Sequence, residues 1–134
     1  MKQAIVDTDT LSYFFRGNSI VVDKVDKYLL EFGLINISIV TYYEILNGLL
    51  YKDANTQLRR FQEFVDYNTI LPLTVLSADK SAQIYAELRK TGKTISHNDV
   101  LIAGIAITND LILITNNTDH FERISELALD NWTI

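Results

Sequence analysis

Carboxylate side chains are the most informative chemical groups in this sequence, because four of them stand where an α/β chain gathers its ligands. Asp7 directly follows a short apolar segment that predicts a buried strand. Glu44 and Asp99 each fall in the first turn of a predicted helix, and Asp119 falls in the loop after the predicted strand Leu111–Ile114. In open sheets of parallel strands, ligands bind at the edge formed by the carboxyl ends of the strands. We therefore expect these carboxylates to converge at that edge.

Converging carboxylates have a definite chemical use. Like charges at close range raise each other's pKa, so the arrangement is stable only with a compensating cation. A hard divalent ion with oxygen ligands is the usual partner. Mg²⁺ or Mn²⁺ in such a site activates a water, orients a phosphate and stabilises the leaving oxygen. The pattern therefore indicates hydrolysis of phosphodiester bonds.

Each acid also has a purely local interpretation. Glu44 and Asp99 stand three residues after a Thr and a Ser, which is the spacing of a capping box, although Asp is not the usual residue there. Asp9 is predicted to be a helix N-cap rather than a ligand. Asp7 is harder to explain locally, since a carboxylate at the end of a buried strand needs a partner and no basic residue stands nearby in the sequence.

Strand-like and helix-like segments alternate along the chain, which is typical of a parallel sheet with crossover helices. The predicted strands are Gln3–Val6, Leu34–Ile39, Thr69–Leu73, Leu111–Ile114 and the edge strand Ala128–Thr133. The predicted helix caps are Thr8 or Asp9, Asn18, Thr41, Ser77, and Ser96 or Asn98. A further helix is predicted over Asp53–Asn68.

Composition predicts one globular domain over residues 1–134, with 48% hydrophobic and 22% charged residues. There is no Cys, no signal-peptide pattern and no apolar run of the roughly 20 residues that span a bilayer, so we expect a cytoplasmic protein without a membrane segment. The apolar density of Tyr42–Leu50 and Leu58–Val65 exceeds what one helix face needs, which favours a partner groove or a dimer surface there.

The net charge of −5 argues against binding nucleic acid through bulk charge, but local basic patches and a divalent cation still permit it. The candidates for contacts with an RNA backbone are Arg16, Arg59, Arg60, Lys90, Lys93 and Arg123. His97 and His120 are expected near the rim of the acidic site, where the ordinary interpretation is a surface histidine.

Four sequence blocks in order resemble one known family. They are Val6–Ser12, Ile37–Gly48, Ile95–Gly104 and Leu113–Ile124, followed by Asp130–Trp132. Together they resemble a PIN-domain ribonuclease, specifically a VapC-type toxin of a bacterial toxin–antitoxin pair. The resemblance covers nearly the whole chain.

The resemblance implies a three-layer α/β/α fold with a central, mostly parallel twisted sheet of four to five strands flanked by helices. It implies a Mg²⁺- or Mn²⁺-dependent endoribonuclease that cleaves structured RNA, such as tRNA or a ribosomal RNA loop. Asp7, Glu44 and Asp99 would be the acidic core and the metal ligands. A homodimer silenced by a small antitoxin, whose C-terminal segment covers the site, is also implied.

One departure from the family pattern concerns the fourth acid. Many relatives carry it at the position of Asn117, whereas here the acid comes two residues later, at Asp119. Either Asp119 reaches back into the site, or Asn117 supplies a neutral contact. Thr8, Asn98 and Thr115 are further candidates for orienting the carboxylates or the phosphate.

Two other functions stay open at this point. The opening Asp7-Thr-Asp9-Thr resembles haloacid-dehalogenase-like phosphatases, in which Asp7 would be the nucleophile and Asp9 the acid/base. Those enzymes also need a positioned lysine, for which Lys93 is a poor candidate, and a downstream acidic pair where this chain has Asn116 and Asn117. The second alternative is a degenerate, non-catalytic PIN fold that binds RNA or a partner.

Overall fold

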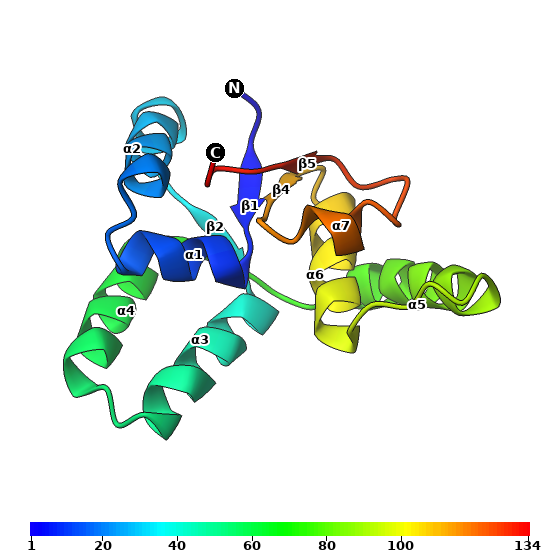
Figure 1. The fold of residues 1–134 in the computed structure, drawn as a ribbon, viewed down its shortest axis with the longest axis horizontal. Helices are drawn as coiled ribbons and strands as arrows, with labels where there is room; N and C mark the ends of the chain where they lie inside the picture. Colours follow the sequence, from blue (N-terminus) through cyan, green and yellow to red (C-terminus); the bar gives the residue numbers. More distant parts are fainter.

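The computed structural model describes residues 1–134 and has a five-stranded sheet in the order β3-β2-β1-β4-β5 (Figure 1). Every neighbouring pair of strands is parallel, as the alternating pattern predicts. The strands are β1 (Ala4–Val6), β2 (Asn36–Ser38), β3 (Thr69–Leu71), β4 (Ile112–Ile114) and β5 (Leu129–Asp130). They are shorter than the predicted strands, but each lies within its predicted range.

Seven helices connect the strands. They are α1 (Thr8–Phe15), α2 (Ser19–Phe32), α3 (Ile39–Tyr51), α4 (Asn55–Tyr67), α5 (Val75–Lys90), α6 (His97–Thr108) and the short α7 (Thr118–Phe121). No helix is long and apolar enough to cross a membrane.

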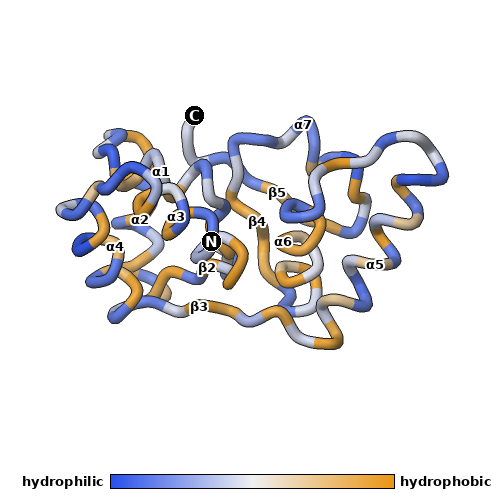
Figure 2. Tube along the Cα trace, turned by 90° about the horizontal axis from the view of Figure 1, so that it is seen from below, coloured by the Kyte–Doolittle hydropathy of each residue, from blue (hydrophilic) through white to orange (hydrophobic).

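Alternating side chains of the central strand divide the core into two layers. Ala4 and Val6 of β1 pack with residues of α1, α2 and α4, whereas Ile5 packs with residues of α5, α6 and α7. Successive side chains of a strand point to opposite faces, so both faces of the sheet are covered. Figure 1 shows the two groups of helices on either side of the strands, and Figure 2 shows apolar residues gathered along β4 and α6. The three-layer prediction is confirmed.

The strand order places a topological switch point beside β1. From β1 the chain builds outward through β2 to β3, then returns to the other side of β1 with β4 and β5. Crevices at the carboxyl ends of strands on either side of such a point are the usual ligand sites of open α/β sheets. The residues that directly follow β1 and β4 are therefore placed to form a site.

Three predicted helix caps are wrong by one to three positions. Asp7 rather than Thr8 or Asp9 caps α1, and its side chain accepts a hydrogen bond from the Thr8 amide. Ser38 rather than Thr41 caps α3. Thr74 rather than Ser77 caps α5, in a reciprocal capping box with Ser77 as its third residue. Each true cap has extended backbone angles, which a cap requires and a residue type alone does not reveal.

The predicted caps Asn18 and Ser96 are confirmed. Gly33 ends α2 in the left-handed region, with φ of 82°, as its predicted terminal position requires. Gly104 of α6 faces Ser81 and the Ser77 carbonyl of α5, where a Cβ atom would clash, so the small residues of α6 admit α5 closely.

The last residues of the chain are fastened to the loop after β4. The Asn116 side-chain oxygen accepts hydrogen bonds from Asn131 Nδ2 at 3.1 Å and Thr133 Oγ1 at 3.0 Å. Trp132 between them is buried against Tyr28, with ring centroids 5.6 Å apart. This segment therefore supports the loop that faces the end of β1.

Candidate active site

A cavity of about 400 Å³ opens at the carboxyl edge of the sheet, at the switch point beside β1. Its lining contains no apolar side chain and consists of Asp7, Thr8, Asp9, Glu44, Asp99, Asn116 and Asn117. These residues come from the end of β1, the first turn of α1, helix α3, the first turn of α6 and the loop after β4. The structure thus brings Asp7, Glu44 and Asp99 together as the sequence predicts.

Asp7 is the buried end of this cavity, with only 5% of its surface exposed. One carboxylate oxygen accepts from the Thr8 amide at 2.8 Å, and the other accepts from Thr115 Oγ1 at 2.7 Å. Burial, and next the charge of Asp9, raise the pKa of Asp7 to about 7 despite these two hydrogen bonds. Because the raised pKa means that the ionised form of Asp7 is disfavoured, a bound cation would stabilise that form.

Asp9 lies in the first turn of α1 and faces the same cavity, which sequence reasoning missed. Its Oδ1 accepts from the Thr10 amide at 2.6 Å and its Oδ2 from the Asn116 amide at 3.1 Å. Because the cap of α1 is Asp7, the residue two positions later lies at the same helix end. With Asp7 recognised as the N-cap, the Asp7–Asp9 spacing would have predicted that Asp9 also lies at the cavity.

Glu44 is held by side chains from two other helices. Its Oε1 accepts from Thr8 Oγ1 at 2.7 Å, and the Thr8 hydroxyl lies 3.0 Å from that of Thr41. Asn98 Nδ2 lies 3.5 Å from Glu44 Oε2. Since α3 starts at Ile39, Glu44 lies beyond the capping turn and its capping-box interpretation is wrong.

Asp99 receives only half of a capping interaction. Its amide donates to Ser96 Oγ at 3.1 Å, while its carboxylate faces the cavity. Burial is the largest cause that raises the pKa of Asp99; the Ser96 hydrogen bond opposes it, and the charge of Glu44 adds to it. The carboxylates therefore repel one another across the cavity.

The loop after β4 contributes neutral groups to the cavity rather than the predicted fourth acid. Asp119 is exposed in α7 and does not line the cavity. Asn117 does line it, and its amide nitrogen donates to Thr115 Oγ1 at 3.0 Å. Its side chain contacts His120 at 2.9 Å.

The donor set fits a hard divalent cation. The lining offers carboxylates, one hydroxyl and side-chain amides, with no histidine, sulfur or basic residue. As they stand, no three acidic or histidine side chains are close enough together to bind one metal ion by themselves. The charge must nevertheless be compensated from outside the protein, because no Lys or Arg reaches the cavity.

The comparisons with known proteins agree with this geometry. Residues 4–127 match the sequence model of the PIN domain. The chain belongs to the PIN-domain family, in its VapC branch. The tRNA(fMet)-specific endonuclease VapC of Shigella flexneri is 32% identical over 134 residues, covering 99% of this chain and 100% of the relative. Ribonuclease VapC1 of Methanocaldococcus jannaschii is 31% identical over 130 residues, covering 93% and 83%.

Solved structures of PIN proteins superpose closely on the chain. DNA-bound VapBC from Salmonella typhimurium gives a TM-score of 0.88 at 26% identity, covering 98% of this chain and 99% of the other. FitAcB from Neisseria gonorrhoeae gives a TM-score of 0.83 at 27% identity, covering 97% and 98%. The Salmonella typhimurium structure is bound to DNA, and the PIN membership agrees with the resemblance seen in the sequence.

Membership in the PIN family makes the phosphatase alternative wrong. A phosphatase of that type needs a lysine beside its nucleophile, and no lysine lines the cavity around Asp7.

Proposed function

We propose that this chain is a Mg²⁺- or Mn²⁺-dependent endoribonuclease, the toxin of a toxin–antitoxin pair, and that residues 1–134 form a single PIN domain acting in the cytoplasm. The observation that carries the proposal is the cavity at the switch point, where Asp7, Asp9, Glu44 and Asp99 face one another without a basic residue. A carboxylate set of this kind matches the metal-assisted hydrolysis of phosphodiesters. The VapC ribonucleases among the relatives support the same reaction class, cleavage of RNA by a hydrolase.

In this proposal Asp7, Glu44 and Asp99 would hold the metal ion, directly or through the water molecules that complete its coordination shell. The metal, when bound, supplies an activated water and neutralises charge on the phosphate. Thr115 orients Asp7 through its 2.7 Å hydrogen bond, and Thr8 fixes Glu44 through another of the same length. Fixed hydrogen-bond partners of this kind set the direction and basicity of metal ligands.

We assign the fourth carboxylate to Asp9 of α1, in place of the predicted Asp119. Asp9 lines the cavity and its charge raises the pKa of Asp7, whereas Asp119 is exposed outside the lining. Asn117 then stands across the cavity as a neutral contact to water or phosphate. In this assignment the fourth carboxylate comes from α1 rather than from the loop after β4.

Structured RNA, such as tRNA or a ribosomal RNA loop, is the substrate we propose. The Shigella flexneri relative is named as a tRNA(fMet)-specific endonuclease. The cavity contains no aromatic side chain on which a base could stack, so it supports the reaction and leaves stacking contacts with the RNA to the surfaces around it.

A small antitoxin is the proposed protein partner, and the VapBC complexes among the structural neighbours support it. A groove of about 260 Å³ lies between α1, α3 and α4. Its lining has an apolar set and a basic set: Phe15, Ile45, Leu49 and Phe61, and Arg16, Lys52 and Arg60. A segment with apolar and acidic side chains suits both sets. Tyr43, Val75 and Leu76 are exposed, and we propose that they contribute apolar contacts to the homodimer.

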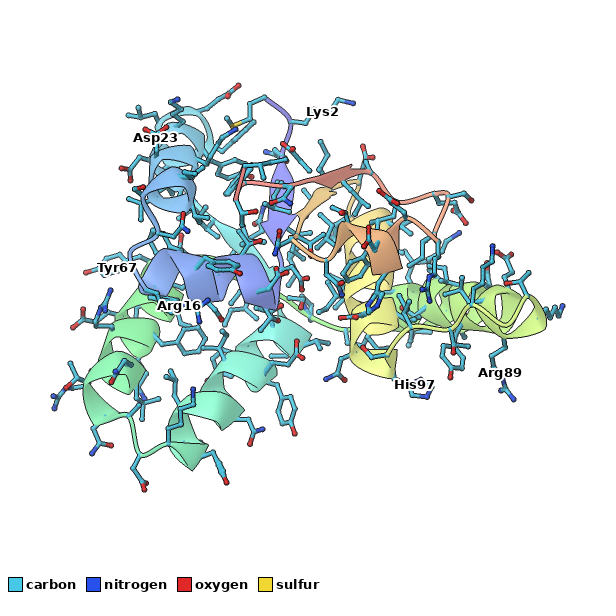
Figure 3. All side chains as sticks on the ribbon, in the orientation of Figure 1. Lys2, Arg16, Asp23, Tyr67, Arg89 and His97 are labelled. Atoms are coloured by element: carbon cyan, nitrogen blue, oxygen red, sulfur yellow. The ribbon has the colours of Figure 1, made fainter.

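The decisive test is cleavage of total tRNA and ribosomal RNA by purified protein. We expect cleavage with Mg²⁺ or Mn²⁺, none with EDTA, and a loss of more than about 1,000-fold in Asp7→Asn and Asp99→Asn. Asp23→Asn is the matched control, because that carboxylate is exposed on α2, far from the cavity (Figure 3). Cleavage that survives EDTA, or that persists in both site variants, would contradict the proposal, as would protein that binds RNA without cutting it.

A further inference from the structure

A second hollow lies on the opposite flank of α6 from the acidic cavity. It is a slot of about 320 Å³ between α5 and α6. Tyr85, Arg89 and His97 form its wall, and small side chains such as Ala82 and Ala86 leave it open. The proposed reaction makes no use of these residues.

The rings of Tyr85 and His97 pack against each other in this slot in a tilted arrangement. Their ring centroids are 4.4 Å apart and their planes meet at 31°. Tyr85 is partly buried against the core, whereas His97 is exposed, so the pair has an anchored ring and an accessible ring. The Arg89 guanidinium lies 5.9 Å from the Tyr85 centroid. Aromatic, histidine and arginine planes of this kind stack on unpaired nucleobases.

One basic side chain, Arg89, lines the slot, and no acidic side chain does. Arg89 and Lys90 end α5, and Lys93 follows in the next turn; none of them forms a salt bridge. Arg123 donates to the carbonyls of Lys93 and Thr94 at 3.5 and 3.1 Å, which fixes that turn, and its side chain lines a different hollow together with Glu87 and Glu126. In a chain of net charge −5, the Arg89 guanidinium is the group at this slot that complements a phosphate backbone.

The slot and the acidic cavity share one rigid element. His97 is the first residue of α6 and Asp99 the third, so they lie about 3 Å apart along the helix axis. The buried Ser81 hydroxyl donates to the Val100 carbonyl at 2.9 Å and joins α5 to this turn. A group bound at His97 is therefore held at a fixed position relative to Asp99. Figure 3 shows His97 and Arg89 projecting together along the lower side of α5 and α6.

We propose that the Tyr85–His97 pair, flanked by Arg89, is a platform for an unpaired base of the RNA substrate, on the side of the first turn of α6 opposite to the acidic cavity where the strand is cut. The platform rests on the proposed function, because it adds a base contact to that same reaction. It accounts for recognition that the purely polar cavity does not supply.

The test separates stacking from charge by measuring binding in EDTA, where the proposed reaction cannot proceed. The probes are a short fluorescein-labelled single-stranded RNA and a matched strand with abasic riboses. We expect His97→Ala to weaken binding of the RNA about tenfold and to leave binding of the abasic strand unchanged. His97→Phe restores the affinity. Arg89→Ala weakens both strands, whereas its control Lys2→Ala, at the opposite end of the molecule in Figure 3, weakens neither.

Three results would overturn the platform. The first is an unchanged RNA affinity in His97→Ala, and the second is an equal loss of affinity for the RNA and the abasic strand. The third is a changed sedimentation of His97→Ala, which would assign the slot to contact between copies of the chain. Failure here is distinguishable from failure of the nuclease proposal. Metal-dependent cleavage that requires Asp7 and Asp99 stands or falls in a separate assay, whatever happens at His97.

Discussion

The ends of the neighbouring strands β1 and β4 form opposite walls of one cavity, and they are chemically unlike. The end of β1 supplies two carboxylates, Asp7 and Asp9, whereas the end of β4 supplies Thr115 and the neutral amides of Asn116 and Asn117. Hydrogen bonds join the walls, since Thr115 donates to Asp7 and the Asn116 amide donates to Asp9. One wall therefore carries the charge and the other orients it.

The largest expected effect is on the charged wall, in the pH dependence of stability. Burial raises the pKa of Asp7 from 3.8 to about 7, so the folded protein holds this proton more tightly than the unfolded chain. In EDTA, the contribution of Asp7 to stability is fully present below about pH 4 and is lost as the pH rises to about 7, by about 1.4 kcal/mol per pH unit. Urea unfolding at several pH values measures this.

The matched variants for that experiment are Asp7→Asn and Asp23→Asn. Asp7→Asn should flatten the dependence over this pH range, and Mn²⁺ should flatten it in the wild type. Asp23 is exposed, so Asp23→Asn should retain the dependence. An unchanged slope in Asp7→Asn would assign the titration to another group.

The next largest effect comes from moving a carboxylate from the β1 wall of the cavity to the β4 wall. We expect Asp9→Asn to weaken Mn²⁺ binding measured by calorimetry and to lower cleavage about 100-fold. The double variant Asp9→Asn with Asn117→Asp returns a carboxylate from the other wall and should recover much of both. Asp119→Asn should behave as wild type, because that side chain lies outside the lining. If Asp119→Asn loses activity and Asp9→Asn does not, the fourth acid belongs to α7.

The smallest effect concerns the neutral wall. Thr115→Val removes the hydroxyl that donates to Asp7 and accepts from the Asn117 amide. We expect a loss of about tenfold in cleavage rate and a further rise in the pKa of Asp7. Thr108→Val is the control, since that hydroxyl contacts the Gly104 carbonyl in α6. Equal rates in the two variants would mean that Thr115 does not orient the carboxylate.

Sequence pattern predicted the parallel sheet, both confirmed caps and the meeting of Asp7, Glu44 and Asp99, because period and position along strands determine these features. It misplaced Asp9 and Asp119. The role of Asp9 was mispredicted because the cap of α1 depends on backbone angles at Asp7 that residue types do not reveal. The Tyr85–His97 pair joins two helices by rings twelve positions apart, a contact that no local pattern signals.

The fastening of Asn131 and Thr133 to Asn116 has a practical consequence for handling the protein. A chain shortened after Asp130, or trimmed there by a protease, would lose both side-chain contacts on Asn116 and expose the indole-packed face of Tyr28. Such a protein would keep its sheet and yet have a loosened active-site wall. Affinity tags are therefore better placed before Met1, because the chain enters the central strand β1 at its amino end, away from the carboxylates.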